Sequence, residues 1–162
     1  MLRLVLAVAL AASLVAVATP TVEDARTTRT ERLAERELDR VAAAANSLAR
    51  EEDPGARRTL GVSFPGESPT EAPLAFVAVG GLPDGELAVD TAETDVLAYR
   101  VAGGRQRVLR VEADLRIRSD EGDPVASDSR PLVLRGGETY RLTLRLARLD
   151  GRRTVVVPSR DI

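Results

Sequence analysis

The sequence contains no cysteine, histidine, lysine or tryptophan. Without cysteine the chain has no disulfide bonds, no thiolate metal sites and no lipid-modified N-terminal cysteine. The missing histidine removes the side chain that most often transfers protons in enzymes, and neither cysteine nor lysine is present as a nucleophile. These absences favour a protein that is not an enzyme.

Aromatic residues are also scarce, with two phenylalanines and two tyrosines. The 23 basic residues, all of them arginine, nearly balance 25 acidic residues, so the net charge is −2. A nearly neutral chain attracts polyanions weakly, and so few aromatic rings cannot form a stacking platform for bases. We therefore expect no nucleic acid as a partner, and no motif indicates a small-molecule substrate or a cofactor.

Residues 4–22 carry no charge, and as a helix they would be about 28 Å long, close to the thickness of a bilayer core. One interpretation of residues 1–22 is a transmembrane segment. The other is a signal peptide, because Ala16-Val17-Ala18 resembles a cleavage site that would remove residues 1–18. Arginines are more numerous after the segment than before it, which by the positive-inside rule favours an internal C-terminal side.

Residues 23–53 predict an amphipathic helix, since they contain no glycine or proline and are rich in helix formers. Asp53-Pro54-Gly55 would end it. Small and apolar residues recur at helical spacing along one stripe: Ala34, Leu38, Val41, Ala45 and Leu48. We expect this stripe to pack on the chain's own sheet, and the alternative is that its upper part packs on other anchored helices.

Residues 54–162 predict an antiparallel β domain. The expected strands are residues 59–64, 74–79, 86–90, 95–102, 105–118, 131–134, 139–149 and 152–158. Gly103-Gly104 and Asp150-Gly151 are typical of hairpin turns. The predicted fold class is therefore α+β, with the long N-terminal helix packed on a small antiparallel meander.

The predicted strand 105–118 alternates cleanly between apolar and charged residues. Its apolar members are Leu109, Val111, Ala113, Leu115 and Ile117. Arg116, Arg141 and Arg145 would lie on the outer, charged side of the sheet. Such a basic stripe suits an acidic partner, but solvated cross-strand ion pairs are the interpretation that we favour.

Few residues qualify as candidates for chemistry. Ser63, Ser68 and Thr70 flank a proline-rich loop that has no nucleophile-elbow motif. A second loop holds four carboxylates without the spacing of an EF-hand, namely Asp120, Glu121, Asp123 and Asp128. We interpret it as a solvated loop, so the sequence predicts no catalytic, cofactor-binding or metal-binding residue.

The segment LVLAVALAASLVAVATPTVEDAR, followed by RTERLAERELDRVAAAANSLA, resembles an uncharacterised haloarchaeal family of small membrane-anchored proteins associated with type IV pilus-type secretion ATPases. The layout, an apolar helix with Pro20 near its end, then an amphipathic helix and a sheet, is similar to type IV pilins and pseudopilins. The chain departs from processed prepilins because no glycine precedes Leu4 and the first acidic residue is Glu23.

The resemblance implies an accessory or structural subunit of an archaeal type IV pilus-like or secretion system. It implies a single-pass protein of the cell membrane, with an extracytoplasmic C-terminal domain. The implied partners are the lipid bilayer and other membrane-anchored pilus or secretion subunits. The alternative is a secreted or surface binding protein made of the β domain after cleavage of residues 1–18.

Overall fold

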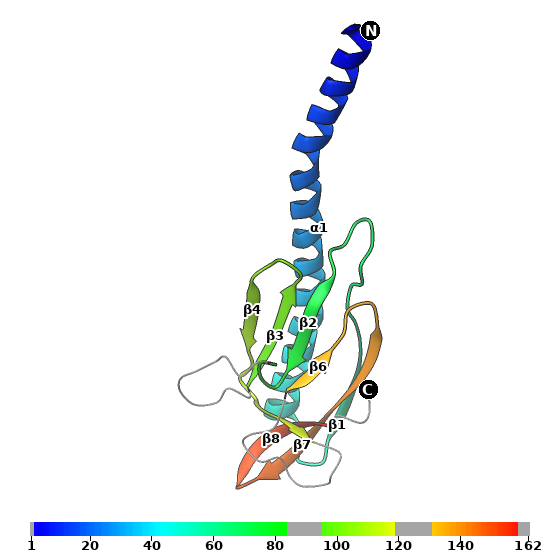
Figure 1. Cartoon of the computed structure of the whole chain (residues 1–162). Helices are drawn as coiled ribbons and strands as arrows, with labels where there is room; N and C mark the ends of the chain where they lie inside the picture. The colour runs from blue at the N-terminus through cyan, green and yellow to red at the C-terminus, as the bar shows by residue number, and fades with distance from the viewer. Residues whose placement is uncertain (1, 84–94, 119–130, 159–162) are drawn as a thin grey trace.

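The computed structural model describes residues 2–83, 95–118 and 131–158, except for the side chains of residues 2–4 and 11–20. In this part of the chain one long helix is followed by eight strands, which form two sheets (Figure 1). The predicted strand 86–90 and the acidic loop 119–130 lie outside the described residues.

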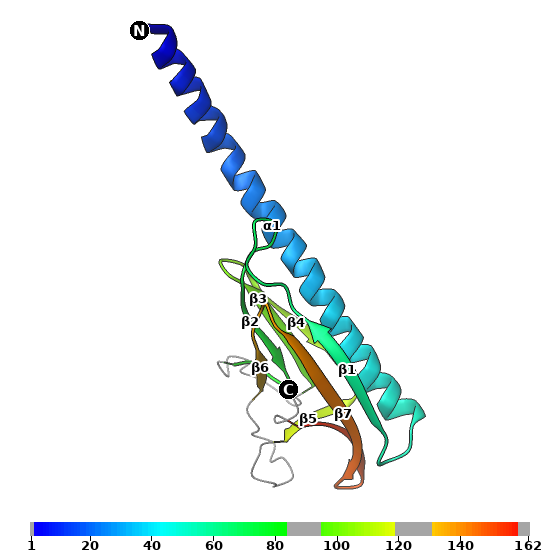
Figure 2. The same ribbon diagram turned by 90° about the vertical axis from the view of Figure 1, so that its right-hand side faces the viewer.

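Helix α1 (Leu2–Glu51) is continuous and passes through Pro20 without interruption. Its second half lies along the sheets, whereas its first half extends well beyond them (Figure 2). The chain leaves the helix near the predicted Asp53-Pro54-Gly55, where Gly55 has a φ of +102° and its N–H donates to the carbonyl of Leu146. This bond fixes the helix end to a strand of the domain.

Sheet 1 has the strand order β1-β7-β8-β5. Its strands are β1 (Arg57–Ser63), β5 (Asp114–Arg118), β7 (Thr139–Leu149) and β8 (Arg152–Pro158). The pairs β1–β7 and β7–β8 are antiparallel, whereas β5 and β8 run parallel. Asp150 and Gly151, both with positive φ, form the predicted tight turn between β7 and β8.

Sheet 2 is antiparallel, with the order β4-β3-β2-β6. Its strands are β2 (Leu74–Val79), β3 (Val96–Val101), β4 (Gln106–Arg110) and β6 (Leu132–Leu134). The predicted Gly103-Gly104 turn joins β3 to β4, and Gly103 has the positive φ that this turn needs.

The prediction of an α+β fold with one antiparallel meander is wrong. Beside the helix, the described structure has two sheets and not one meander, and one of the sheets contains a parallel pair. The physical reason is that two strands pair with partners far away in sequence, β1 with β7 and β2 with β6. Turn signals identify only hairpin neighbours, so they led to a meander.

The predicted long strand over residues 105–118 is divided into β4 and β5, which lie in different sheets. Asn46 of α1 supports the division, because its Oδ1 accepts hydrogen bonds from the N–H groups of Glu112 (3.1 Å) and Ala113 (3.0 Å). Backbone donors that a single strand would pair in a ladder are thus paired with a side chain.

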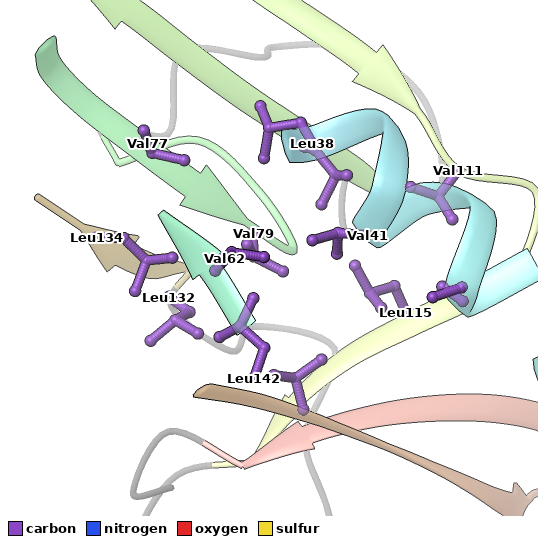
Figure 3. Close-up of a cluster of buried hydrophobic side chains, with 14 of the residues drawn as sticks. Leu38, Val41, Val62, Val77, Val79, Val111, Leu115, Leu132, Leu134 and Leu142 are labelled. Carbon is purple, nitrogen blue, oxygen red and sulfur yellow. The ribbon is translucent and has the colours of Figure 1, made fainter. Parts of the chain in front are cut away.

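One core lies between α1 and the inner faces of both sheets, as Figure 3 shows for its central residues. The predicted helical stripe, Ala34, Leu38, Val41, Ala45 and Leu48, is at most 1 % exposed and belongs to this core. The side chains opposite the stripe come from strands of both sheets, including Val62, Val77, Leu115 and Leu142. The prediction that the stripe packs on the chain's own β domain is therefore confirmed.

The membrane prediction is contradicted. Among the residues that the structure describes, no helical stretch combines the length and the apolar character that crossing a bilayer requires. The predicted transmembrane segment in residues 1–22 and the single-pass location in the cell membrane, with an extracytoplasmic C-terminal domain, are corrected accordingly.

Candidate functional site

The described residues do not form a metal centre. Within residues 2–83, 95–118 and 131–158, no three acidic side chains gather closely enough to hold a cation. The carboxylates considered from the sequence, Asp120, Glu121, Asp123 and Asp128, lie outside these ranges. The remaining candidates are hydroxyl groups, the one deeply buried tyrosine and exposed surfaces.

The hydroxyl candidates make local hydrogen bonds. Ser63 Oγ accepts from Thr139 Oγ1 (3.2 Å) across the β1–β7 pair. Ser68 Oγ lies 3.4 Å from Thr70 Oγ1 and accepts from the N–H of Thr70. Among the described residues no carboxylate is hydrogen-bonded to any of these hydroxyls, so none has the adjacent base that a nucleophile requires.

Tyr99 on β3 is 2 % exposed and faces α1. Burial raises the pKa of its phenol to about 12, and the nearby carboxylates of Glu35 and Glu31 act in the same direction. A phenol with this pKa stays protonated at neutral pH. Tyr99 is therefore a protonated residue of the main core.

Where α1 leaves the sheets, two of its side chains form hydrogen bonds with the backbone of the loop after β1. Thr30 is fully buried; its Oγ1 donates to the carbonyl of Ala72 (3.0 Å) and accepts from the N–H of the same residue (2.9 Å). One turn earlier, Arg26 donates to the carbonyls of Ser68 (2.8 Å) and Glu71 (3.1 Å). These contacts hold the loop after β1 against the helix and mark the border between its two halves.

A shallow groove of about 360 Å³ lies on the same side, between α1 and the end of β1. Its lining residues are Leu33, Arg36, Glu37, Ser63, Phe64, Pro65 and Glu71. A larger hollow of about 660 Å³ continues from Leu33 and Arg36 along the helix to Asp24. An open surface therefore follows α1 from the domain onto the projecting half.

The projecting half of α1 exposes apolar side chains. Val5, Leu6, Val8 and Leu10 are each 63–64 % exposed, and Val22 is 54 % exposed. No strand of the described structure lies beside residues 5–10 (Figures 1 and 2). Consecutive apolar residues exposed on a helix that leaves its domain are typical of an interaction segment.

A second surface lies on the outer side of sheet 1. Four exposed arginines, which we call the arginine face, occupy outward positions there: Arg57, Arg141, Arg145 and Arg152. The sequence prediction placed Arg141 and Arg145 on this side, which the register confirms, but it missed Arg57 and Arg152 because their place depends on pairing with β7. Arg57 lies directly opposite Arg145.

The predicted cross-strand ion pairs are not formed among the described residues. Arg116, the third predicted member, bonds to Asp114 on its own strand (2.9 Å). Glu112 pairs instead with Arg50 of α1 (3.3 Å). Within the described part of the chain, no acidic side chain forms an ion pair with any member of the arginine face.

One family of known sequences matches nearly the whole chain. The chain matches the family described as "Domain of unknown function (DUF7311)" over residues 1–160, and it belongs to this family. No curated protein and no solved structure matches it. The function must therefore be argued from the two surfaces.

Proposed function

We propose that the protein is a non-catalytic, pilin-like accessory subunit of a type IV pilus-like or secretion assembly. In this proposal the projecting half of α1 packs beside the N-terminal helices of other subunits, and the two sheets form a head that the helix carries. The observation that supports it is the division of one continuous helix into a half buried in the domain core and a half with exposed apolar residues.

The exposed side chains supply the energy for such packing. Fully burying a valine or leucine side chain contributes about 1.5–3 kcal/mol. Val5, Leu6, Val8 and Leu10 lie within two turns, and Ala7 and Ala9 between them allow a neighbouring helix to approach closely. The border contacts of Thr30 and Arg26 fix the direction in which this half leaves the head.

Site-specific photo-crosslinking in the native cells tests the proposal. A photoreactive amino acid replaces Leu6 in one variant and Arg110, an exposed residue on β4 of the head, in the control. We expect the first variant alone to crosslink to the N-terminal helix of a pilus or secretion subunit, identified by mass spectrometry. Crosslinks from position 6 only to lipid, or to no protein, would contradict the proposal.

A second candidate function is a secreted or surface binding domain that lacks residues 1–18. The observation that favours it is the arginine face, which belongs to the β domain and does not need the projecting helix. The intact mass of the protein from its native source separates the two functions. A mature chain that begins at Thr19 lacks the exposed segment 5–10, which would exclude the helix-packing function and favour the binding domain.

A further inference from the structure

The outer side of the β1–β7 pair has a regular polar pattern. We call each outward-facing pair of directly opposite residues on β1 and β7 a row. Three of the rows are Arg57 opposite Arg145, Thr59 opposite Thr143, and Gly61 opposite Arg141. A fourth row pairs Ser63 with Thr139. Arginines therefore alternate with hydroxyl pairs, and Thr59 and Thr143 are bonded to each other at 3.3 Å.

The arginines on these rows have no acidic partner in the described structure. Like charges placed directly opposite each other in a sheet are destabilising, and Arg57 and Arg145 form such a pair. Both side chains are exposed, and neither forms an ion pair with any described residue. Beside Arg141, the missing side chain of Gly61 leaves open space, because apart from its chain neighbours no described residue has an atom within 4 Å of where its Cβ would be.

These observations define a surface with unpaired guanidinium groups, hydroxyl donors and an open position beside Arg141. Guanidinium groups bind carboxylates through two parallel hydrogen bonds, and the hydroxyl rows supply further donors. We propose that the arginine face binds an extended polypeptide segment that carries carboxylate side chains.

The spacing of the rows favours a polypeptide. Same-face positions along a strand repeat about every 6.8 Å, so four rows extend over about 20 Å. An extended peptide laid along β7 has the same repeat. Because Arg141 and Arg145 are four residues apart on β7, carboxylates at every fourth residue of the peptide would reach both of their rows. About seven residues cover the four rows, as residues 139–145 of β7 do.

Larger polyanions fit this surface less well. None of the eight positions in the four rows is aromatic, so the surface has no platform on which bases stack. The whole chain has a net charge of −2, so a long polyanion that extended past the arginine face would meet a surface without a basic excess. A short carboxylate segment contacts the arginine face alone.

Binding of a fluorescein-labelled oligoglutamate peptide to the full-length protein, followed by fluorescence anisotropy at low salt, tests this inference. The double variant Arg57→Glu/Arg145→Glu should weaken binding at least about tenfold, because attraction becomes repulsion. The matched control, Arg105→Glu/Arg110→Glu, makes the same change in net charge at sheet 2. Arg105 directly precedes the edge strand β4, and Arg110 is its last residue. We expect this control to change binding less than about twofold, and circular dichroism checks that both variants are folded.

A milder variant, Arg141→Gln, should weaken binding several-fold and keeps the opposed arginine pair intact. Equal weakening by the two double variants, or no binding of oligoglutamate by the wild type, would overturn the inference. Tighter binding of inorganic polyphosphate or oligothymidylate than of oligoglutamate would also overturn it, since the surface would then select phosphate. The helix packing proposed above is independent of these results, because no residue of α1 is changed.

Discussion

The two halves of α1 belong to one unbroken helix and have opposite surroundings. From Thr30 to Leu48 the helix turns a buried residue toward the sheets every three or four positions, and those from Ala34 onward form part of the main core. From Val5 to Leu10 the side chains are exposed. The second half depends on the β domain for its partners, whereas the described side chains of residues 5–10 do not belong to the main core.

The largest expected effect comes from placing a charge in the buried half. Leu38→Asp puts a carboxylate at a position that is 0 % exposed, and we expect it to destabilise the protein by more than about 4 kcal/mol or to unfold it. Chemical unfolding followed by circular dichroism measures the loss. The matched change in the projecting half, Leu6→Asp, should alter stability by less than about 0.5 kcal/mol.

Equal destabilisation by Leu6→Asp and Leu38→Asp would show that the projecting half also contributes to the fold. A folded Leu38→Asp protein that no longer associates with its partners would make the stripe a partner surface. The two substitutions therefore test directly whether the projecting half of α1 contributes to stability as the buried half does.

The border between the halves should show the next largest effect. Thr30→Val removes the hydroxyl that bonds both the N–H and the carbonyl of Ala72 and leaves these buried backbone groups without a partner. We expect a loss of about 2–3 kcal/mol in the free energy of unfolding. Thr28→Val, at an exposed position two residues earlier, is the control and should change stability little. Similar losses in both variants would mean that valine itself, and not the lost hydrogen bonds, destabilises α1.

A pH effect of similar or smaller size should come from Tyr99, at the contact between α1 and sheet 2. Its pKa is raised from 10.0 to about 12 in the folded state, so folding favours the protonated phenol. This contribution is fully present below pH 10 and is lost as the pH rises toward 12, by about 2–3 kcal/mol at most.

Unfolding in urea at several pH values between 8 and 12 measures this loss. Tyr99→Phe removes the titrating group, so the fall in stability between pH 10 and 12 should be smaller in this variant. An identical fall in both proteins would assign the pH dependence to other groups, such as Tyr140, whose pKa burial also raises.

The sequence predicted those parts of the fold that are determined locally. The stripe from Ala34 to Leu48 and the hairpin turns at Gly103 and Gly151 follow from periodicity and turn chemistry within a few residues. Strands β2, β7 and β8 begin and end where the pattern placed them. Each of these features needs information from one short stretch of chain.

The division into two sheets could not be predicted in this way. The alternation of apolar residues continues through Val111 and Ala113, so no local signal separates β4 from β5. At the separation, Asn46, which is distant in sequence, accepts hydrogen bonds from the N–H groups between the two strands. The predicted set of outward arginines was incomplete for the same reason, because the place of Arg57 beside Arg145 depends on the pairing of β1 with β7.

The outer sides of the two sheets also differ from each other. The outer side of sheet 2 contains a small buried apolar cluster that includes Phe76 and Ala98, with Arg100 stacked over the Phe76 ring at 5.1 Å. The outer side of sheet 1 exposes unpaired arginines. Along β8 the outer side of sheet 1 is also buried, at Thr154 and Val156, but the charges of the arginine face form no ion pair in the described structure.

The smallest expected effect tests whether that charge has a stability cost. Arg57→Glu places a carboxylate directly opposite Arg145 and replaces like-charge repulsion with an ion pair, so we expect a gain of about 0.2–1 kcal/mol. Chemical unfolding of Arg57→Glu and of the control Arg105→Glu at low and at high salt measures the gain, which salt should reduce in the first variant alone. A gain would mean that the natural chain keeps a destabilising arginine where an acid would stabilise the sheet, as expected of a residue needed for binding. A loss would show instead that Arg57 supports the fold and would remove the reason for assigning it to a binding surface.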